Sequence, residues 1–235
     1  ALYELAKDPL VGPDCGWNPH QSREESQQVL TKLLMNSYTW AIVLKETGEV
    51  IGDISLMPFG TGSHTKNENE KEIGFWLGRP YWGNGYMPEA CLRLMTYAFE
   101  EKNASCIWIA HHDKNEKSAR VQEKCGFRYQ WTTEGVDVPL MHEKRTGHVN
   151  LMTKDDWLWR KLYEAARSVQ NGRKISDYVE AGGVAAAILS SSGRVYTGVC
   201  VDTCSTLGIC AERNAIFNML TNGEQEICKV LTVMS

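Results

Sequence analysis

A glycine-rich turn at residues 82–87 constrains the fold of this chain more than any other segment. Its sequence is Trp-Gly-Asn-Gly-Tyr-Met, and it lies between an apolar run at Glu72–Leu77 and a helical pattern at Pro88–Glu101. Glycine reaches backbone conformations that are closed to other residues, so Gly83 and Gly85 predict a tight turn between a strand and a helix. The backbone N–H groups of such a turn, together with the helix N-terminus, can bind an anion such as a phosphate.

This motif differs from the G-x-G-x-x-G fingerprint of dinucleotide-binding proteins, because Pro88 occupies the position of the third glycine. A Gly-x-Gly pair by itself also fits a tight turn that binds no ligand. The choice between a phosphate-binding turn and a turn without a ligand therefore depends on the elements around it.

Hydrophobic periodicity and turn signals predict the elements around the turn. Ser22 and Glu25 form a capping box that starts one helix, and a shorter helix is predicted at residues 115–124. Residues 60–70 are rich in Gly, Ser and Asn and predict an exposed hairpin loop. This order of elements predicts an α/β (α+β) fold with one mixed sheet and flanking helices. The predicted strands are residues 40–44, 50–56, 72–77, 106–110, 127–132 and 147–153.

The length of the chain predicts a second domain. At about 150 residues per domain, 235 residues correspond to about 1.6 domains. We place the boundary between residues 153 and 154, which gives domains 1–153 and 154–235. The elements predicted in the second domain are a helix at residues 154–170, a hairpin of strands at 184–189 and 195–201, a helix at 210–221 and a strand at 228–234.

Two strings in the first domain carry a family resemblance. Residues 72–90 read EIGFWLGRPYWGNGYMPEA and residues 115–127 read NEKSARVQEKCGF. Together they resemble the GNAT N-acetyltransferases, in particular the RimJ/RimL branch that acetylates ribosomal-protein N-termini. The resemblance covers most of residues 1–153 and implies acetyl-coenzyme A as acetyl donor. It implies an amine acceptor, which could be a protein N-terminus, a polyamine, or an antibiotic or metabolite amine.

The resemblance assigns most cofactor contacts to the glycine turn, which cradles the pyrophosphate of acetyl-coenzyme A in that family. It also implies that a backbone N–H near Leu77 or Gly78 polarises the thioester carbonyl, and that Asn115 contacts the pantetheine arm. Met87 departs from the family pattern, in which a small residue is expected. The predicted cofactor-binding residues are Leu77, Trp82, Gly83, Asn84, Gly85, Tyr86, Met87 and Asn115.

Acetyl transfer to an amine requires a neutral amine, a polarised thioester carbonyl and a proton for the departing thiolate. By resemblance Glu72 is the general base, although a solvated glutamate at a strand edge fits the sequence equally well. Ser118 is assigned to protonate the thiolate, because Gln122 stands where many relatives carry a tyrosine. Water is the alternative acid, and Ser118 could also be an ordinary hydroxyl at a helix start.

Three histidines lie near the predicted active site in the sequence and are candidates for catalysis or acceptor binding. His111 and His112 end a strand beside the predicted cleft, and a surface or core role is favoured over catalysis for both. His20 precedes the first long helix, where related enzymes place contacts to the acceptor.

The second domain resembles another family. Residues 197–216 read TGVCVDTCSTLGICAERNAI, and the string resembles the cytidine deaminases, including the blasticidin deaminase type. The resemblance implies a partial three-layer α/β/α domain, with Cys210 as the first zinc ligand and Glu212 as the catalytic acid and base. A thiolate at a helix N-terminus is stabilised by the helix dipole, which suits a metal ligand.

The remaining zinc ligands of that family belong to a P-C-x-x-C motif, which would follow the strand that ends near Met234. We therefore expect zinc only if ligands beyond Ser235 are supplied. In the full protein the two domains could form a bifunctional acetyltransferase and deaminase. A non-catalytic oligomerisation module is the alternative, and a soft-metal site at Cys200, Cys204 and Cys210 is disfavoured against buried thiols.

Charge and apolar content bear on partners and location. The chain carries 25 basic and 29 acidic residues, which argues against a nucleic-acid polymer as partner. No apolar run approaches the ~20 residues of a membrane helix. No leader opens the sequence, so its eight cysteines are expected as thiols in the cytoplasm. The deaminase resemblance further implies a homo-oligomer.

Overall fold

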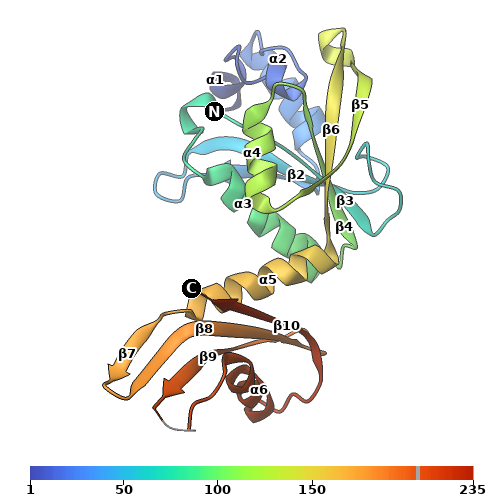
Figure 1. Ribbon diagram of the computed structural model, residues 1–235. Helices are drawn as coiled ribbons and strands as arrows, with labels where there is room; N and C mark the ends of the chain where they lie inside the picture. Colours follow the sequence, from blue (N-terminus) through green and yellow to red (C-terminus); the bar gives the residue numbers. More distant parts are fainter. Residues whose placement is uncertain (205–206, 235) are drawn as a thin grey trace. The chain divides into compact units, whose positions relative to one another are not determined.

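The computed structural model describes residues 1–204 and 207–234 (Figure 1). The chain divides into two compact units, Ala1–Lys154 and Asp155–Ser235. Ser205, Thr206 and Ser235, which belong to the predicted second domain, lie outside the described residues.

The first unit is built on a six-stranded sheet with the order β1-β2-β3-β4-β6-β5. All neighbouring strands are antiparallel except β3 and β4, which are parallel. The predicted mixed sheet is therefore confirmed. The strands are β1 (Thr39–Val43), β2 (Val50–Met57), β3 (Glu70–Leu77), β4 (Cys106–His112), β5 (Arg128–Val138) and β6 (Glu143–Thr153).

Helices flank this sheet, as predicted (Figure 1). Ser22 caps α2 as predicted, because its Oγ accepts the Glu25 N–H at 3.1 Å. The reciprocal bond of the capping box differs, since the Glu25 carboxylate accepts the N–H of Gln21, at 2.6 Å, and not that of Ser22. The helix after the glycine turn begins at Tyr86, two residues before the predicted start at Pro88. The helices are α1 (Leu2–Ala6), α2 (Arg23–Val29), α3 (Tyr86–Thr96) and α4 (Glu116–Cys125), with π-helical turns at Leu30–Leu34 and Tyr97–Glu101 after α2 and α3.

The helix α3 packs through the apolar face that its sequence periodicity indicates. The residues of that face, Cys91, Leu94, Met95, Ala98 and Phe99, are all buried. The helix α4 lies beside α3 (Figure 1). The two are joined by Cys125, whose Sγ donates to the Pro88 carbonyl at 3.8 Å. Burial of these side chains fixes the glycine turn that precedes α3 against the sheet.

The parallel pair β3 and β4 opens toward its C-terminal ends. The two strands pair only from Glu70 with Cys106 to Ile73 with Ile109. Beyond that point β3 stays with β2 as far as Leu77, whereas β4 stays with β6 as far as His112. The two strand ends therefore diverge and leave a gap in the middle of the sheet.

The second unit has a four-stranded sheet in which β8 (Val179–Ser190) pairs antiparallel with β7 (Arg173–Ser176), β9 (Val195–Thr203) and β10 (Ile227–Met234). The strand β7 lies between the predicted helix at residues 154–170 and the predicted strand at 184–189, where no element was predicted. The even-numbered side chains Ala186 and Ile188 of β8 pack with α6 (Ala211–Thr221). Their odd-numbered neighbours pack with α5 (Lys154–Val169), so the two helices cover opposite faces of this sheet.

Candidate active site

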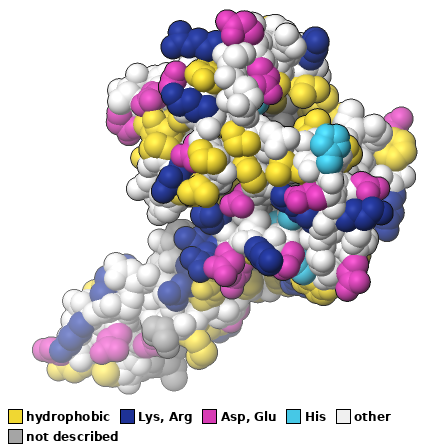
Figure 2. All heavy atoms as spheres, turned by 90° about the horizontal axis from the view of Figure 1, so that it is seen from above, with side chains coloured by type: hydrophobic (Ala, Val, Ile, Leu, Met, Phe, Trp, Pro, Cys, Tyr) yellow, Lys and Arg dark blue, Asp and Glu magenta, His cyan; other side chains and the backbone are white. Residues whose placement is uncertain are grey.

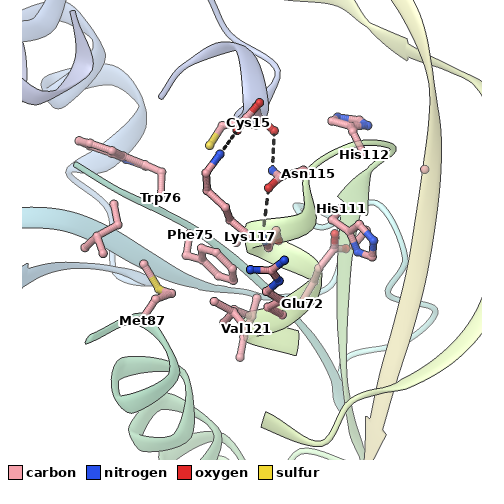
Figure 3. Close-up of a pocket in the computed structure, with 18 of the residues that line it drawn as sticks. Cys15, Glu72, Phe75, Trp76, Met87, His111, His112, Asn115, Lys117 and Val121 are labelled. Atoms are coloured by element: carbon pink, nitrogen blue, oxygen red, sulfur yellow. Dashed lines mark hydrogen bonds and ion pairs between the residues drawn. The ribbon is translucent and has the colours of Figure 1, made fainter. Parts of the chain in front are cut away.

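A cavity of about 860 Å³ opens where β3 and β4 diverge (Figure 3). In Figure 3, Phe75, Trp76 and Met87 lie on one side of this cavity, and His111 and His112 on the other. Nine predicted site residues of the first unit line it: Glu72, Leu77, Trp82, Gly83, Gly85, Tyr86, Met87, Asn115 and Ser118. The side chain of Asn84 does not line the cavity, since it is exposed and its Nδ2 donates to the Trp82 carbonyl at 3.2 Å.

The glycine turn has the geometry of an anion cradle. Gly83 and Gly85 have φ values of 81° and 84°, a left-handed conformation that favours glycine. No side chain caps the first turn of α3, so its backbone N–H groups remain available to a ligand. The turn is held in place by Trp82, whose Nε1 donates to the Leu77 carbonyl at 2.7 Å. Met87 is 4% exposed and forms part of the cavity wall.

Three cationic side chains of α4 also line the cavity: Lys117, Arg120 and Lys124. Their spacing of three and four residues places them on one face of the helix. Lys117 also lies over the Trp82 ring, with Nζ 4.4 Å from its centroid. The sequence analysis missed these residues, although the spacing could have revealed them.

The gap between the strands exposes one backbone donor of β3. Gly78, the alternative oxyanion donor, gives its N–H to the Ile51 carbonyl at 2.8 Å. Because successive N–H groups of a strand point to opposite sides, the Leu77 N–H points to the side from which β4 has diverged. Leu77 is therefore the candidate donor, and Gly78 is not.

Glu72 lies in the central strand β3 and is 6% exposed. The alternative of a solvated strand-edge glutamate is therefore wrong. Its Oε2 accepts the backbone N–H of His64 at 2.8 Å, and its Oε1 lies 3.0 Å from Nδ1 of the same histidine. His64 lies in the segment that the sequence analysis predicts as an exposed hairpin loop, so this contact was not predicted.

Asn115 and Ser118 lie together at the start of α4. The Oδ1 of Asn115 accepts the Ser118 N–H at 3.0 Å, and its Nδ2 donates to the Asp14 carbonyl at 2.9 Å (Figure 3). The Ser118 Oγ accepts from Gln122 Nε2 at 3.1 Å, which leaves its hydroxyl hydrogen able to donate elsewhere. Gln122, at 2% exposed, is itself held by Asn150, whose Nδ2 donates to Oε1 at 2.5 Å.

Two of the three histidines weighed from the sequence lie in the cavity wall. Burial lowers the pKa of both His111 and His112, and the neighbouring His148 lowers that of His111 further. Their predicted position beside the cleft is therefore confirmed, and the preference for a non-catalytic role stays a prediction. His20 is a core residue instead, because it is 8% exposed and its Nδ1 lies 2.7 Å from Ser26 Oγ.

The second unit does not assemble a zinc site from its predicted residues. Cys210 is an exposed N-cap of α6, and Glu212 Oε1 accepts from Thr232 Oγ1 at 2.8 Å. Hydrogen bonds from its own backbone N–H, Thr232 and Cys210 lower the pKa of Glu212, which opposes the role of a proton shuttle. Within residues 1–204 and 207–234, no three His, Cys, Asp or Glu side chains are grouped to hold a metal ion. The donor set therefore does not fit zinc.

The surface carries charges of both signs. On the face shown in Figure 2, basic and acidic side chains are interspersed. In the described part of the chain, no helix has both the length and the apolar character that a membrane crossing needs.

Comparison with known proteins agrees with this geometry. Residues 1–128 match the family model of the acetyltransferase (GNAT) domain. The uncharacterized protein YkkB of Bacillus subtilis (strain 168) is 31% identical over 108 residues, which are 46% of this chain and 60% of that protein. The uncharacterized N-acetyltransferase p20 of Bacillus licheniformis is 32% identical over 89 residues, 38% of this chain and 47% of that protein. The chain thus spans less than two thirds of the curated relatives it matches.

Among solved structures, the ribosomal-protein-S5-alanine acetyltransferase from Vibrio fischeri superimposes with a TM-score of 0.52 at 22% identity. The superposition covers 66% of this chain and 86% of that one. At this identity the similarity shows the fold.

Proposed function

Because the chain belongs to the GNAT acetyltransferase family through residues 1–128, we propose that its first unit transfers the acetyl group of acetyl-coenzyme A to an amine. The observation that carries this proposal is the cavity at the diverging ends of β3 and β4. The anion cradle, a free strand N–H, a buried carboxylate and a hydroxyl all face this one space.

The residues of the cavity suit the parts of acetyl-coenzyme A, which supplies a thioester with an electrophilic carbonyl carbon. The backbone N–H groups of residues 83–87 at the start of α3 and the three cations of α4 would hold the phosphates, because both sets of groups are positive and line the same cavity. The cofactor-binding roles of Leu77, for the thioester oxygen, and Asn115, for the pantetheine arm, remain proposals. Since Asn115 already caps α4 and binds Asp14, only its remaining hydrogen-bonding capacity is open to a ligand.

The chain's own residues would provide the proton transfers. Glu72 supplies the negative charge of the basic group that takes a proton from the amine, and Ser118 donates a proton to the departing thiolate. The Gln122 amide supports Ser118 by donating to its Oγ, which directs the hydroxyl hydrogen away from Gln122. Both roles are assigned on position in the cavity and on the chemistry that acetyl transfer requires.

For the acceptor, we propose a protein N-terminus as the first class to test. The support is the name of a structural neighbour, the ribosomal-protein-S5-alanine acetyltransferase from Vibrio fischeri. A polyamine and an antibiotic or metabolite amine are the other classes. A cytoplasmic location and a homo-oligomeric state remain predictions.

The test is release of coenzyme A, followed with a thiol reagent, in the presence of an alanine-leading peptide, a polyamine and an aminoglycoside. We expect acetyl-coenzyme A to raise the melting temperature of the protein and one amine class to accelerate release. Absence of stabilisation by acetyl-coenzyme A at millimolar concentration would refute the proposal.

For residues 154–235 we retain the cytidine deaminase resemblance as a proposal about fold alone. The helix on each face of the β8 sheet and the opening of α6 at Cys210 support it. No deaminase chemistry follows, since the donor set does not fit zinc. An assembly module is the alternative, which the exposed Ile227, Val230 and Met234 of β10 favour. Elemental analysis and light scattering test these statements: one zinc per chain would contradict the conclusion that the donor set does not fit zinc, and a zinc-free dimer or tetramer supports the module.

A further inference from the structure

His64 and Glu72 form a pair in which the carboxylate is the more buried partner. Both residues line the cavity, but the Glu72 side chain is 8% exposed and the His64 side chain is 23% exposed. The imidazole is thus the more accessible of the two groups to an acceptor in the cavity.

The hydrogen bonds of this pair define which ring nitrogen can accept a proton. An ionised carboxylate only accepts hydrogen bonds, so Nδ1 of His64, 3.0 Å from Oε1, carries the ring hydrogen. The neutral imidazole then holds its lone pair on Nε2. Among the residues that the structure describes, Nε2 has no hydrogen-bond partner. It is therefore able to receive a proton from a ligand.

The carboxylate itself is poorly placed to meet the acceptor. Its Oε2 already accepts the His64 N–H, and a Cβ added to Gly62 would lie 2.7 Å from the same oxygen. The backbone of the loop therefore covers this side of Glu72. Its other oxygen is occupied by the imidazole.

The loop that carries His64 is fixed at a second point. The buried Glu70 accepts the Lys66 N–H at 3.0 Å and Asn67 Nδ2 at 2.8 Å. The Lys66 ammonium lies over the rings of Trp108 and Trp131, 5.3 Å and 5.9 Å from their centroids. These contacts hold the backbone on the C-terminal side of His64 and pre-organise the imidazole.

We propose that His64 is the catalytic base of the acetyl transfer and that Glu72 is the residue that positions it. The proposal rests on the acetyltransferase function proposed above. Nε2 of His64 takes one proton from the ammonium form of the acceptor and passes it to solvent. The neutral amine then forms a C–N bond with the carbonyl carbon as the C–S bond breaks and its electron pair moves to sulfur. The acetylated nitrogen then loses a second proton, and the thiolate of coenzyme A gains one.

The experiment compares the full-length protein with His64→Ala, His64→Gln and Glu72→Gln. Thr61→Ala is the matched control, since Thr61 lies in the same loop and its hydroxyl donates only to the Pro58 carbonyl. Stabilisation by acetyl-coenzyme A verifies that each variant is folded and binds the donor. Turnover is measured with the most active amine of the panel, with and without added imidazole.

We expect both His64 variants to lose about 100-fold or more in kcat with little change in KM for acetyl-coenzyme A. Free imidazole should restore turnover of His64→Ala in a saturable manner but not that of Glu72→Gln, whereas a structural role would not respond to imidazole. If His64→Ala keeps its kcat within a few fold while Glu72→Gln loses it, Glu72 takes the proton directly. The inference then fails and the acetyltransferase function stands.

A second measurement does not depend on the acceptor. Nitrogen-15 NMR of the histidine rings should show the Nδ1–H tautomer at His64. The population of this tautomer should fall in Glu72→Gln. An Nε2–H tautomer in the unsubstituted protein would overturn the inference, because that nitrogen could not accept a proton. Failure of acetyl-coenzyme A to bind would refute the proposed function itself and the inference with it.

Discussion

The substitution Asp53→Asn should make the first unit more stable at alkaline pH and should matter less in acid. Asp53 lies in β2 at 9% exposure, and its carboxylate accepts a hydrogen bond from Trp76 Nε1. Burial raises the pKa of Asp53 from 3.8 to about 6, although the Trp76 bond opposes the shift. The folded state thus prefers the protonated form, so stability is lost as pH rises from about 4 through about 6.

The magnitude follows from linkage between the two pKa values. A raised pKa of about 6 against 3.8 in the unfolded chain costs about 3 kcal/mol at pH 8 and about 1 kcal/mol at pH 4.5. Asparagine carries no charge at either pH, and its carbonyl oxygen can still accept from Trp76. The stability difference between the variant and the parent should therefore grow by about 2 kcal/mol between these pH values, or roughly 4–8 °C in Tm.

Scanning calorimetry of the full chain measures this difference, and the transition that acetyl-coenzyme A raises identifies the first unit. Taking the change between two pH values removes any cost of the amide that does not depend on pH. Asp177→Asn, an exposed aspartate of the second unit, serves as control and should leave the first transition in place. A difference between Asp53→Asn and the parent that is the same at both pH values would refute the argument from burial.

Three further outcomes are expected. Gly85→Ala and Gly48→Ala both place alanine at a positive φ with open space around Cβ, so their backbone strain is matched. Only Gly85→Ala should weaken acetyl-coenzyme A binding, by about tenfold or 1.4 kcal/mol in a titration. Ser118→Ala should lower kcat about 100-fold without raising KM for acetyl-coenzyme A, and an unchanged kcat would mean that water is the acid. Leu162→Ala removes a fully buried side chain and should lower the stability of the second unit by about 2–5 kcal/mol in calorimetry. A change below about 1 kcal/mol would mean that the neighbouring side chains move in and fill the space left by the leucine.

The elements that the sequence predicted are those whose signals are local. The helix cap at Ser22 and the apolar face of α3 are each contained within a few turns of helix, and both are confirmed. The positive φ values of Gly83 and Gly85 could be predicted because glycine favours that conformation more than other residues do. The short strand β7 was missed because its four residues Arg173–Ser176 are exposed and carry no apolar alternation.

Contacts that depend on how a loop folds could not be predicted in this way. Nothing in the composition of residues 60–70 distinguishes a solvated loop from one that lies on the sheet, because Gly and Ser are common in both. Glu72 and Glu70 require the loop to lie on the sheet. They are two buried carboxylates on one face of β3, and without the loop they would lack these hydrogen-bond donors. The loop supplies those partners through backbone and side-chain donors.

The same requirement connects stability to chemistry at this site. A buried carboxylate costs several kcal/mol unless it is hydrogen-bonded, so the contact of Glu72 with His64 stabilises the fold whether or not the protein is at work. That contact also fixes the hydrogen of the imidazole on Nδ1 and leaves Nε2 toward a ligand. A variant at His64 therefore changes both properties, whereas free imidazole can restore only the chemical one. This separation is why rescue by imidazole, rather than loss of activity alone, distinguishes a base from an anchor of the loop.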